Sequence, residues 1–147
     1  MLTRASLVWF GIMLAAILNG AVRDVLLVPR LGDPVARALS CVTLAAVILL
    51  ITWLTLDWIR PPSSADAWRI GVMWLAMTLA FEFLAGHFLF RTPWQTLLAD
   101  YDVLAGRLWV LVLIATLAAP GILYRLAHNP SRVMEISTPA SDDTHRR

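Results

Sequence analysis

Four apolar stretches, each long enough to cross a lipid bilayer, divide this chain of 147 residues. A helix needs roughly 20 residues to span the hydrocarbon layer, and the stretches cover about residues 5–28, 35–59, 67–90 and 103–127. Hydrophobic residues make up 59% of the chain and charged residues only 15%, a balance that excludes an ordinary soluble domain. Continuous apolar runs also differ from the alternating pattern of an outer-membrane barrel. The sequence therefore predicts an all-α fold, an integral membrane bundle of four helices.

Turn and capping residues mark the boundaries of the predicted spans. Pro29 and the Gly-Asp-Pro turn that follows it are expected to end the first span. In that turn Asp33 is expected to cap the second span, because its carboxylate can accept bonds from free amide groups and Pro34 is tolerated in a first helical turn. Ser63 or Ser64 is expected to cap the third span.

A second cap-and-proline signal, at Thr92 and Pro93, follows the third span. Residues Trp94 to Ala99 then carry apolar side chains on one side, which predicts a short interfacial helix between spans three and four. Residues 1–128 are expected to form one membrane domain. Pro, Ser, Thr and mixed charges without apolar periodicity predict a disordered tail over residues 129–147.

Arginine positions predict the orientation of the chain in the membrane. Four spans place both termini on one side, and seven arginines belong to that side against five on the other. The positive-inside tendency then favours cytoplasmic termini and an exoplasmic opposite face. The seven are Arg4, Arg60, Arg69, Arg125, Arg132, Arg146 and Arg147, and the five are Arg23, Arg30, Arg37, Arg91 and Arg107.

Most polar residues in or beside the spans gather near the face opposite the termini. This asymmetry predicts a polar mouth, a surface where side chains from several spans converge under one leaflet. Besides the residues discussed next, the candidates for the mouth are Asp24, Arg91, Trp94, Asp100, Tyr101 and Asp102. The two aspartates around Tyr101 are also explained by turn formation or capping.

Glu82 is the sharpest single signal in the sequence. It lies roughly 12 Å inside the end of the third span, where a lone carboxylate is costly. Gly71 and Thr78 share its helical stripe, which is expected to turn Glu82 toward the bundle. Arg23 and Arg107 lie at comparable depth. A carboxylate paired with either arginine stays ionised and holds helices together, whereas an unpaired one is driven to its neutral form and can carry a proton.

Asn19 and His87 complete the set of candidate ligand or proton-site residues, Glu82, Arg23, Arg107, Asn19 and His87. His87 reads as a histidine at the membrane surface, and a metal site that combines it with nearby carboxylates has no diagnostic spacing. Cys41 is the only cysteine, so the chain has no internal disulfide. No motif predicts a cofactor, and a net charge of +2 does not indicate nucleic-acid binding.

Several runs of residues resemble one family. They are Asn19-Gly20-Ala21-Val22-Arg23-Asp24, Pro29-Arg30-Leu31-Gly32, Phe81-Glu82-Phe83 with Gly86-His87, and the segment from Trp94 through Asp100-Tyr101 to Gly106-Arg107-Leu108-Trp109. Together they are similar to a group of small four-span bacterial inner-membrane proteins of unassigned function. The resemblance implies a multi-pass location in the bacterial inner membrane and adds no reaction.

Two classes of function remain open at this point. The first is ligand or proton-coupled transport, with Glu82 as the protonatable group, Arg23 and Arg107 as its tuning or substrate-anion partners and Asn19 as a hydrogen-bonding neighbour. Because four helices enclose little space, a homodimer is expected. The second is a non-catalytic membrane subunit or assembly factor whose polar mouth binds another membrane protein. An enzyme that modifies lipids, with His87 as the base, is a weaker third reading, so a non-enzymatic role is favoured.

Overall fold

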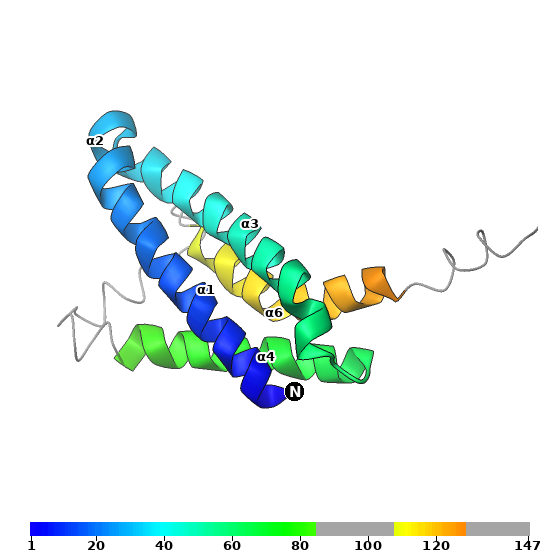
Figure 1. Ribbon diagram of the computed structural model, residues 1–147. Helices are drawn as coiled ribbons and strands as arrows, with labels where there is room; N and C mark the ends of the chain where they lie inside the picture. The colour runs from blue at the N-terminus through cyan, green and yellow to red at the C-terminus, as the bar shows by residue number, and fades with distance from the viewer. Residues whose placement is uncertain (85–107, 129–147) are drawn as a thin grey trace, which may run out of the picture.

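The computed structural model describes residues 1–84 and 108–128 (Figure 1). Within these residues the chain folds into helices alone, and four of the helices are long and apolar enough to cross a membrane. The first runs from Leu2 to Leu31 and consists of α1 (Leu2–Val22), a π-helical turn η1 (Arg23–Leu27) and α2 (Val28–Leu31); the others are α3 (Asp33–Ile59), α4 (Ser64–Leu84) and α6 (Trp109–Ala127). The predicted all-helical, four-span architecture is confirmed for this part of the chain. The predicted interfacial helix, the start of span four and the tail lie outside it.

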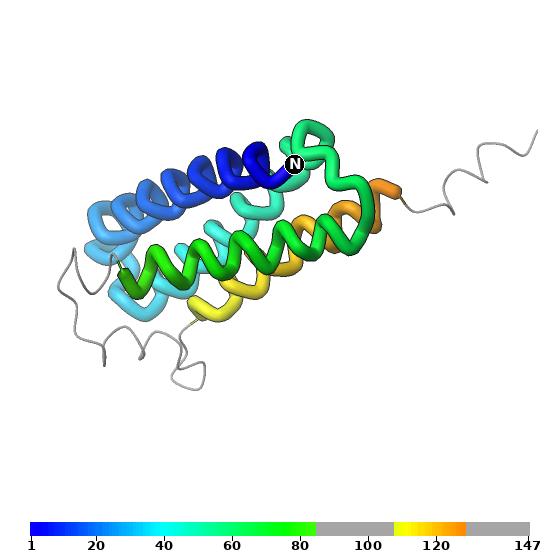
Figure 2. The backbone as a smooth tube through the Cα atoms, turned by 90° about the horizontal axis from the view of Figure 1, so that it is seen from below, coloured from blue at the N-terminus to red at the C-terminus, as the bar shows by residue number. Residues whose placement is uncertain are grey.

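The long helices alternate in direction and form a bundle (Figures 1 and 2). Around the bundle α1 packs on α3, α3 on α6 and α6 on α4, and α4 returns to meet α1. We call the end with the chain N-terminus, the turn from α3 to α4 and the last turn of α6 the termini end. The opposite end, with α2, the last turn of α4 and the first turn of α6, is the mouth end.

The helices α1 and α4 run in the same direction and bury only their first three turns. The buried residues of α1 are Ala5, Val8, Trp9 and Ile12, and those of α4 are Ala67, Ile70, Gly71 and Trp74, with identical helical spacing. Beyond these positions neither helix has a fully buried residue up to Leu31 and Leu84. Figure 1 shows the cause, because α1 and α4 cross near the N-terminus and then diverge toward the mouth end.

Close packing holds the termini half of the bundle together. A Cβ atom at Gly71 would overlap the backbone carbonyl of Leu117, so only glycine lets α4 approach α6 this closely. A Cβ at Gly121 would likewise overlap the indole of Trp68. Trp74 is fully buried, and its indole N–H donates to the Ala5 carbonyl at 2.9 Å, which joins α4 to α1.

Two arginine–tryptophan contacts close the termini end. The Arg4 guanidinium lies 5.7 Å from the ring centre of Trp58 and donates to its carbonyl, which connects α1 with the end of α3. The Arg125 guanidinium lies 5.9 Å from the ring centre of Trp68, connecting the end of α6 with the start of α4. Such cation–π contacts suit a membrane boundary, where one side of each pair is apolar and the other wet.

The first span ends at the predicted Gly-Asp-Pro turn and not at Pro29. The helix passes Pro29 and continues to Leu31 because the π-helical turn η1 precedes the proline. Proline has no N–H for the carbonyl four residues earlier, and its ring crowds that carbonyl. In η1 the bonding widens by one residue, as the Val28 amide donates to the Arg23 carbonyl, so the helix absorbs Pro29 instead of ending there.

The caps of the next two helices agree with the prediction only in part. Gly32 holds the cap position of α3 at a φ of 79°, which favours glycine, while the Asp33 carboxylate accepts from Arg37 Nε at 2.7 Å within the first turn. Asp33 is therefore the first helical residue and not the cap. At α4 the cap is Ser63, whose Oγ accepts from the Asp66 amide at 3.1 Å and donates to the Asp66 carboxylate at 2.7 Å.

Large apolar side chains cover the outside of the bundle. Leu14, Leu18, Trp53 and Leu54 each expose 63 to 66% of their surface. A continuous surface of this kind is unfavourable in water and compatible with hydrocarbon. The helices therefore present apolar surface both to each other and to their surroundings, as membrane spans do.

Candidate functional site

A cavity of about 530 Å³ opens where α1 and α4 diverge, between α1, α3, α4 and α6. Its volume lies in the range of roughly 300 to 1,000 Å³ that small-molecule sites occupy. The residues that line it are Trp9, Ile12, Met13, Ala16, Ile17, Gly20, Ala21, Arg23, Asp24, Leu44, Ile48, Thr78, Phe81, Glu82, Trp109, Val112 and Thr116. The described residues of one chain thus border a ligand-sized space. The expected homodimer stays a prediction.

Glu82 faces this cavity from α4, as its helical stripe predicts. Its carboxylate Oε2 accepts a hydrogen bond at 3.0 Å from the indole N–H of Trp109, in the first turn of α6. The bond fixes one carboxylate oxygen against a rigid aromatic ring. A donor at this place suits an ionisable group in an apolar wall, because a buried polar atom without a partner is costly.

The polar stripe of α4 continues below Glu82, toward the termini end. Thr78 lines the cavity, donates to the Trp74 carbonyl at 2.8 Å and accepts from the Trp9 indole N–H at 3.0 Å. Trp9 also meets Phe81 edge to face, with ring centres 6.5 Å apart. These contacts form the floor of the cavity at the point where α1 and α4 separate.

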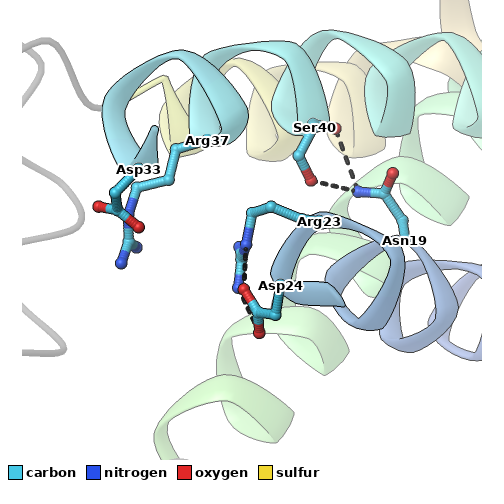
Figure 3. Close-up of polar contacts among 6 residues, drawn as sticks. All are labelled: Asn19, Arg23, Asp24, Asp33, Arg37 and Ser40. Atoms are coloured by element: carbon cyan, nitrogen blue, oxygen red, sulfur yellow. Dashed lines mark hydrogen bonds and ion pairs between the residues drawn. The ribbon is translucent and has the colours of Figure 1, made fainter. Parts of the chain in front are cut away.

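Arg23 and Asp24 line the opposite wall, at the first turn of η1. Arg23 donates to the Asp24 carboxylate from Nε at 2.8 Å and from Nη2 at 3.3 Å, and Figure 3 shows the two side chains turned toward each other. The sequence proposed Arg23 as a partner of Glu82, but in the structure these donors serve Asp24. Single π-helical turns inside α-helices occur frequently at functional sites, so the location of η1 at this wall is a second, independent signal.

Asn19 lies one turn before this pair and points to a different neighbour. Its amide nitrogen donates to Ser40 Oγ at 2.7 Å and to the Ser40 carbonyl at 3.1 Å, across from α1 to α3 (Figure 3). Asn19 is not among the residues that line the cavity. Its observed role is to tie the two helices together close to the mouth end.

Of the predicted site residues, the described part of the chain brings Glu82, Arg23 and Asp24 to one cavity and places Asn19 beside it. The remaining candidates lie outside the described residues; they are His87, Arg91, Trp94, Asp100, Tyr101, Asp102 and Arg107. Trp9 and Trp109 line the cavity but were not among the site residues predicted from the sequence. Their signal was present, since an indole N–H within a span needs an acceptor, and Thr78 and Glu82 offer acceptors at nearby depths.

A second hollow, of about 430 Å³, lies at the termini end between the last turns of α3 and α6. Asp57, Arg60, Tyr124 and His128 contribute its polar groups, and all except Tyr124 are exposed. It is a surface feature away from the bundle interior. Within residues 1–84 and 108–128, no three His, Cys, Asp or Glu side chains gather closely enough to hold a metal ion.

Comparison of the chain with models of protein families, with curated proteins and with solved structures gives no match, so the assignment of function depends on this geometry.

Proposed function

We propose that this chain is a multi-pass protein of the bacterial inner membrane that binds a small ligand in the cavity and couples its passage across the bilayer to protonation of Glu82. The termini lie in the cytoplasm and the mouth end faces outward. The observation that carries this proposal is the position of Glu82, an ionisable group on the wall of a largely apolar, ligand-sized cavity among four membrane-length helices. Ionisable side chains at such positions are rare and characteristically serve ion, proton or substrate pathways.

The surroundings of Glu82 support an exchange of proton and ligand. The Glu82 carboxylate is an acceptor when it is ionised, and the Trp109 indole N–H donates to one of its oxygens. A ligand that donates to Glu82 and a proton that binds it therefore compete for the same group, which is the elementary requirement of coupled transport. The Trp109 contact holds the carboxylate in place in either state.

Reconstituted vesicles provide the test, with ethidium as the probe. Ethidium has an apolar aromatic body and two amino groups that donate hydrogen bonds, and its permanent charge prevents it from carrying protons by itself. We expect an imposed pH gradient to drive ethidium movement in vesicles with the wild-type protein. Glu82→Gln should abolish this movement while the protein still accumulates and folds, because glutamine keeps the size of the side chain but cannot exchange a proton.

Asp57→Asn is the matched control, since it removes a carboxylate at the opposite end of the bundle and away from the cavity. Normal transport by Glu82→Gln would overturn the proposal. Loss of folded protein in Glu82→Gln, with Asp57→Asn unaffected, would instead assign Glu82 an architectural role. Recovery of a stoichiometric membrane protein in pull-downs from native membranes would favour the alternative function, a non-catalytic subunit or assembly factor.

A further inference from the structure

We propose that the second hollow, at the termini end of the bundle, binds a phospholipid whose head group carries both a phosphate and a primary ammonium, as phosphoethanolamine does. The hollow and the cavity lie at opposite ends of the bundle, so this inference goes beyond the proposed function and does not depend on it. Three properties of the hollow lead to it: opposite charges that do not pair, donors and acceptors that are held in place, and a position at the ends of two spans.

Opposite charges line the second hollow without pairing. Asp57 lies in the last turn of α3, and Arg60 directly follows this helix. The backbone of Arg60 is left-handed, with a φ of 52°, and its Nε donates at 3.2 Å to the carbonyl of Asp57 and not to the carboxylate. Within the described residues, neither Asp57 nor Arg60 belongs to an ion pair. A ligand with a negative and a positive group can therefore complement both side chains at once.

The end of α6 supplies a second donor and a second acceptor. The rings of Tyr124 and His128 stack with centres 4.2 Å apart, and His128 Nδ1 lies 3.0 Å from the Tyr124 carbonyl. A carbonyl oxygen only accepts, so this bond places a proton on Nδ1 and leaves Nε2 as an acceptor in the neutral ring. The Tyr124 hydroxyl has no hydrogen-bond partner among residues 1–84 and 108–128. Both rings are thus held in place while the hydroxyl and Nε2 stay available.

The polar atoms of the second hollow select a head group with two functions. The Nη atoms of Arg60 and the Tyr124 hydroxyl are donors, and a phosphate, which accepts, pairs well with a guanidinium. The Asp57 carboxylate and His128 Nε2 are acceptors, and a primary ammonium donates three hydrogen bonds. Contacts within each helix end already hold three of these four side chains, so binding sacrifices less of their conformational freedom.

The second hollow also has the size and the position of a head-group site. Its volume of about 430 Å³ lies within the range of roughly 300 to 1,000 Å³ that small-molecule sites occupy. It lies at the ends of α3 and α6, and the ends of membrane-length helices reach the level of the lipid head groups. Leu54 lies three residues before Asp57 on the same side of α3 and is 64% exposed, so it offers apolar surface to an attached acyl chain.

Native mass spectrometry of the full-length protein in detergent, with added lipids of identical acyl chains, tests this inference. The probes are phosphatidylethanolamine, phosphatidylcholine, whose methylated ammonium has no N–H, and phosphatidylglycerol, which has no ammonium. We expect the wild-type protein to bind phosphatidylethanolamine several-fold more tightly than the other two lipids. Asp57→Asn should remove this preference, because asparagine keeps the size of the side chain but not its charge. Equal binding of phosphatidylethanolamine and phosphatidylcholine by the wild-type protein would overturn the choice of head group.

Arg60→Gln should weaken the binding of all three lipids about tenfold, because each of them contains the phosphate. Arg69→Gln is the matched control, since Arg69 is an exposed arginine in the second turn of α4 that pairs with Asp66 and lies outside the lining of the hollow. Equal losses in the two variants would overturn the hollow as the binding site. Arg60→Lys replaces Arg60→Gln if the latter accumulates poorly, and it should also weaken binding because lysine lacks the fork of donors that matches a phosphate.

Glycerophosphoethanolamine, which is the same head group without acyl chains, separates a lipid from a soluble ligand. We expect it to displace phosphatidylethanolamine only at far higher concentrations, because it lacks the acyl chains that contact the apolar surface at Leu54. Displacement at the concentration of the lipid itself would overturn the assignment to a lipid. Lipid binding is measured without ethidium or a pH gradient, so failure of this inference and failure of coupled transport are separate results.

Discussion

At the termini end, α1 and α4 interlock through Trp74, the Ala5 carbonyl and the first three turns of each helix. At the mouth end the same two helices separate, and their walls carry Arg23, Asp24 and Glu82 around a cavity. The first half of α1 and of α4 therefore packs in the buried interior, whereas the second half of each helix borders the cavity. Substitutions should divide accordingly, with the larger losses of stability at the termini end and the losses of activity at the mouth end.

The largest expected effect is that of Gly71→Ala at the termini end. The new Cβ would overlap the Leu117 carbonyl, so α4 and α6 must move apart, at a cost of about 3 kcal/mol or more in the free energy of unfolding. Thermal loss of monodisperse elution in detergent measures the change. Gly11→Ala is the control with free space at its Cβ and should be neutral or slightly stabilising. Equal stability of the two variants would contradict the close approach of α4 and α6.

Trp74→Phe should have the next largest effect. It removes the indole N–H that the Ala5 carbonyl accepts and leaves a void in a fully buried site, which together cost about 2 kcal/mol. Trp53→Phe provides the comparison, because Trp53 is 63% exposed on the outer surface of α3 and should tolerate the change. Similar thermal midpoints for both variants would show that the crossing of α1 and α4 does not depend on this indole.

Asn19→Ala tests the contact between α1 and α3 close to the mouth end. The loss of its bonds to Ser40 should cost about 1 kcal/mol, in line with hydrogen bonds between helices in membranes. Combining it with Ser40→Ala completes a double-mutant cycle on unfolding free energy. Because the two side chains share a bond, the double variant should lose less than the sum of the single variants. Strict additivity would mean that the bond contributes nothing.

The smallest effect on stability is expected for Trp109→Phe. The phenyl ring keeps much of the packing in this partly buried position and removes the donor to Glu82, so the unfolding free energy should change by less than about 1 kcal/mol. Ethidium transport should nevertheless fall several-fold, because the carboxylate loses the contact that fixes it. Wild-type transport by Trp109→Phe, or failure of this variant to fold, would contradict the proposed division between the two ends of the bundle.

The sequence is sufficient to predict the helices and, for some of them, which face points into the bundle. Length and hydropathy define the four spans, and the stripe through Gly71, Thr78 and Glu82 correctly turns Glu82 inward, because helical periodicity depends on one segment alone. The divergence of α1 and α4 is beyond such reasoning. It depends on which residues of two distant helices meet, as Trp74 meets Ala5 and Gly71 meets Leu117.

The end of the first span and the partners of the charged groups also depend on more than one segment of the sequence. Pro29 ends a helix by local rules, and only the widened turn at Arg23–Leu27 lets the helix continue. By position in the sequence Arg23 lies at the depth of Glu82, but depth does not determine the direction of a side chain, and the Arg23 guanidinium pairs with the adjacent Asp24. Pairing across helices requires knowledge of their rotation, which a single sequence does not contain.

The order of helices around the bundle has a consequence for biogenesis. The ribosome delivers α1, α3 and α4 before α6, yet α3 and α4 each pack extensively on α6. Trp109, Val112 and Thr116, which close one side of the cavity, also belong to that last segment. During synthesis the nascent protein therefore holds Glu82 without its indole partner until translation of the final span is complete. A chaperone or insertase that shields the third span in this interval would protect the chain at its most vulnerable stage.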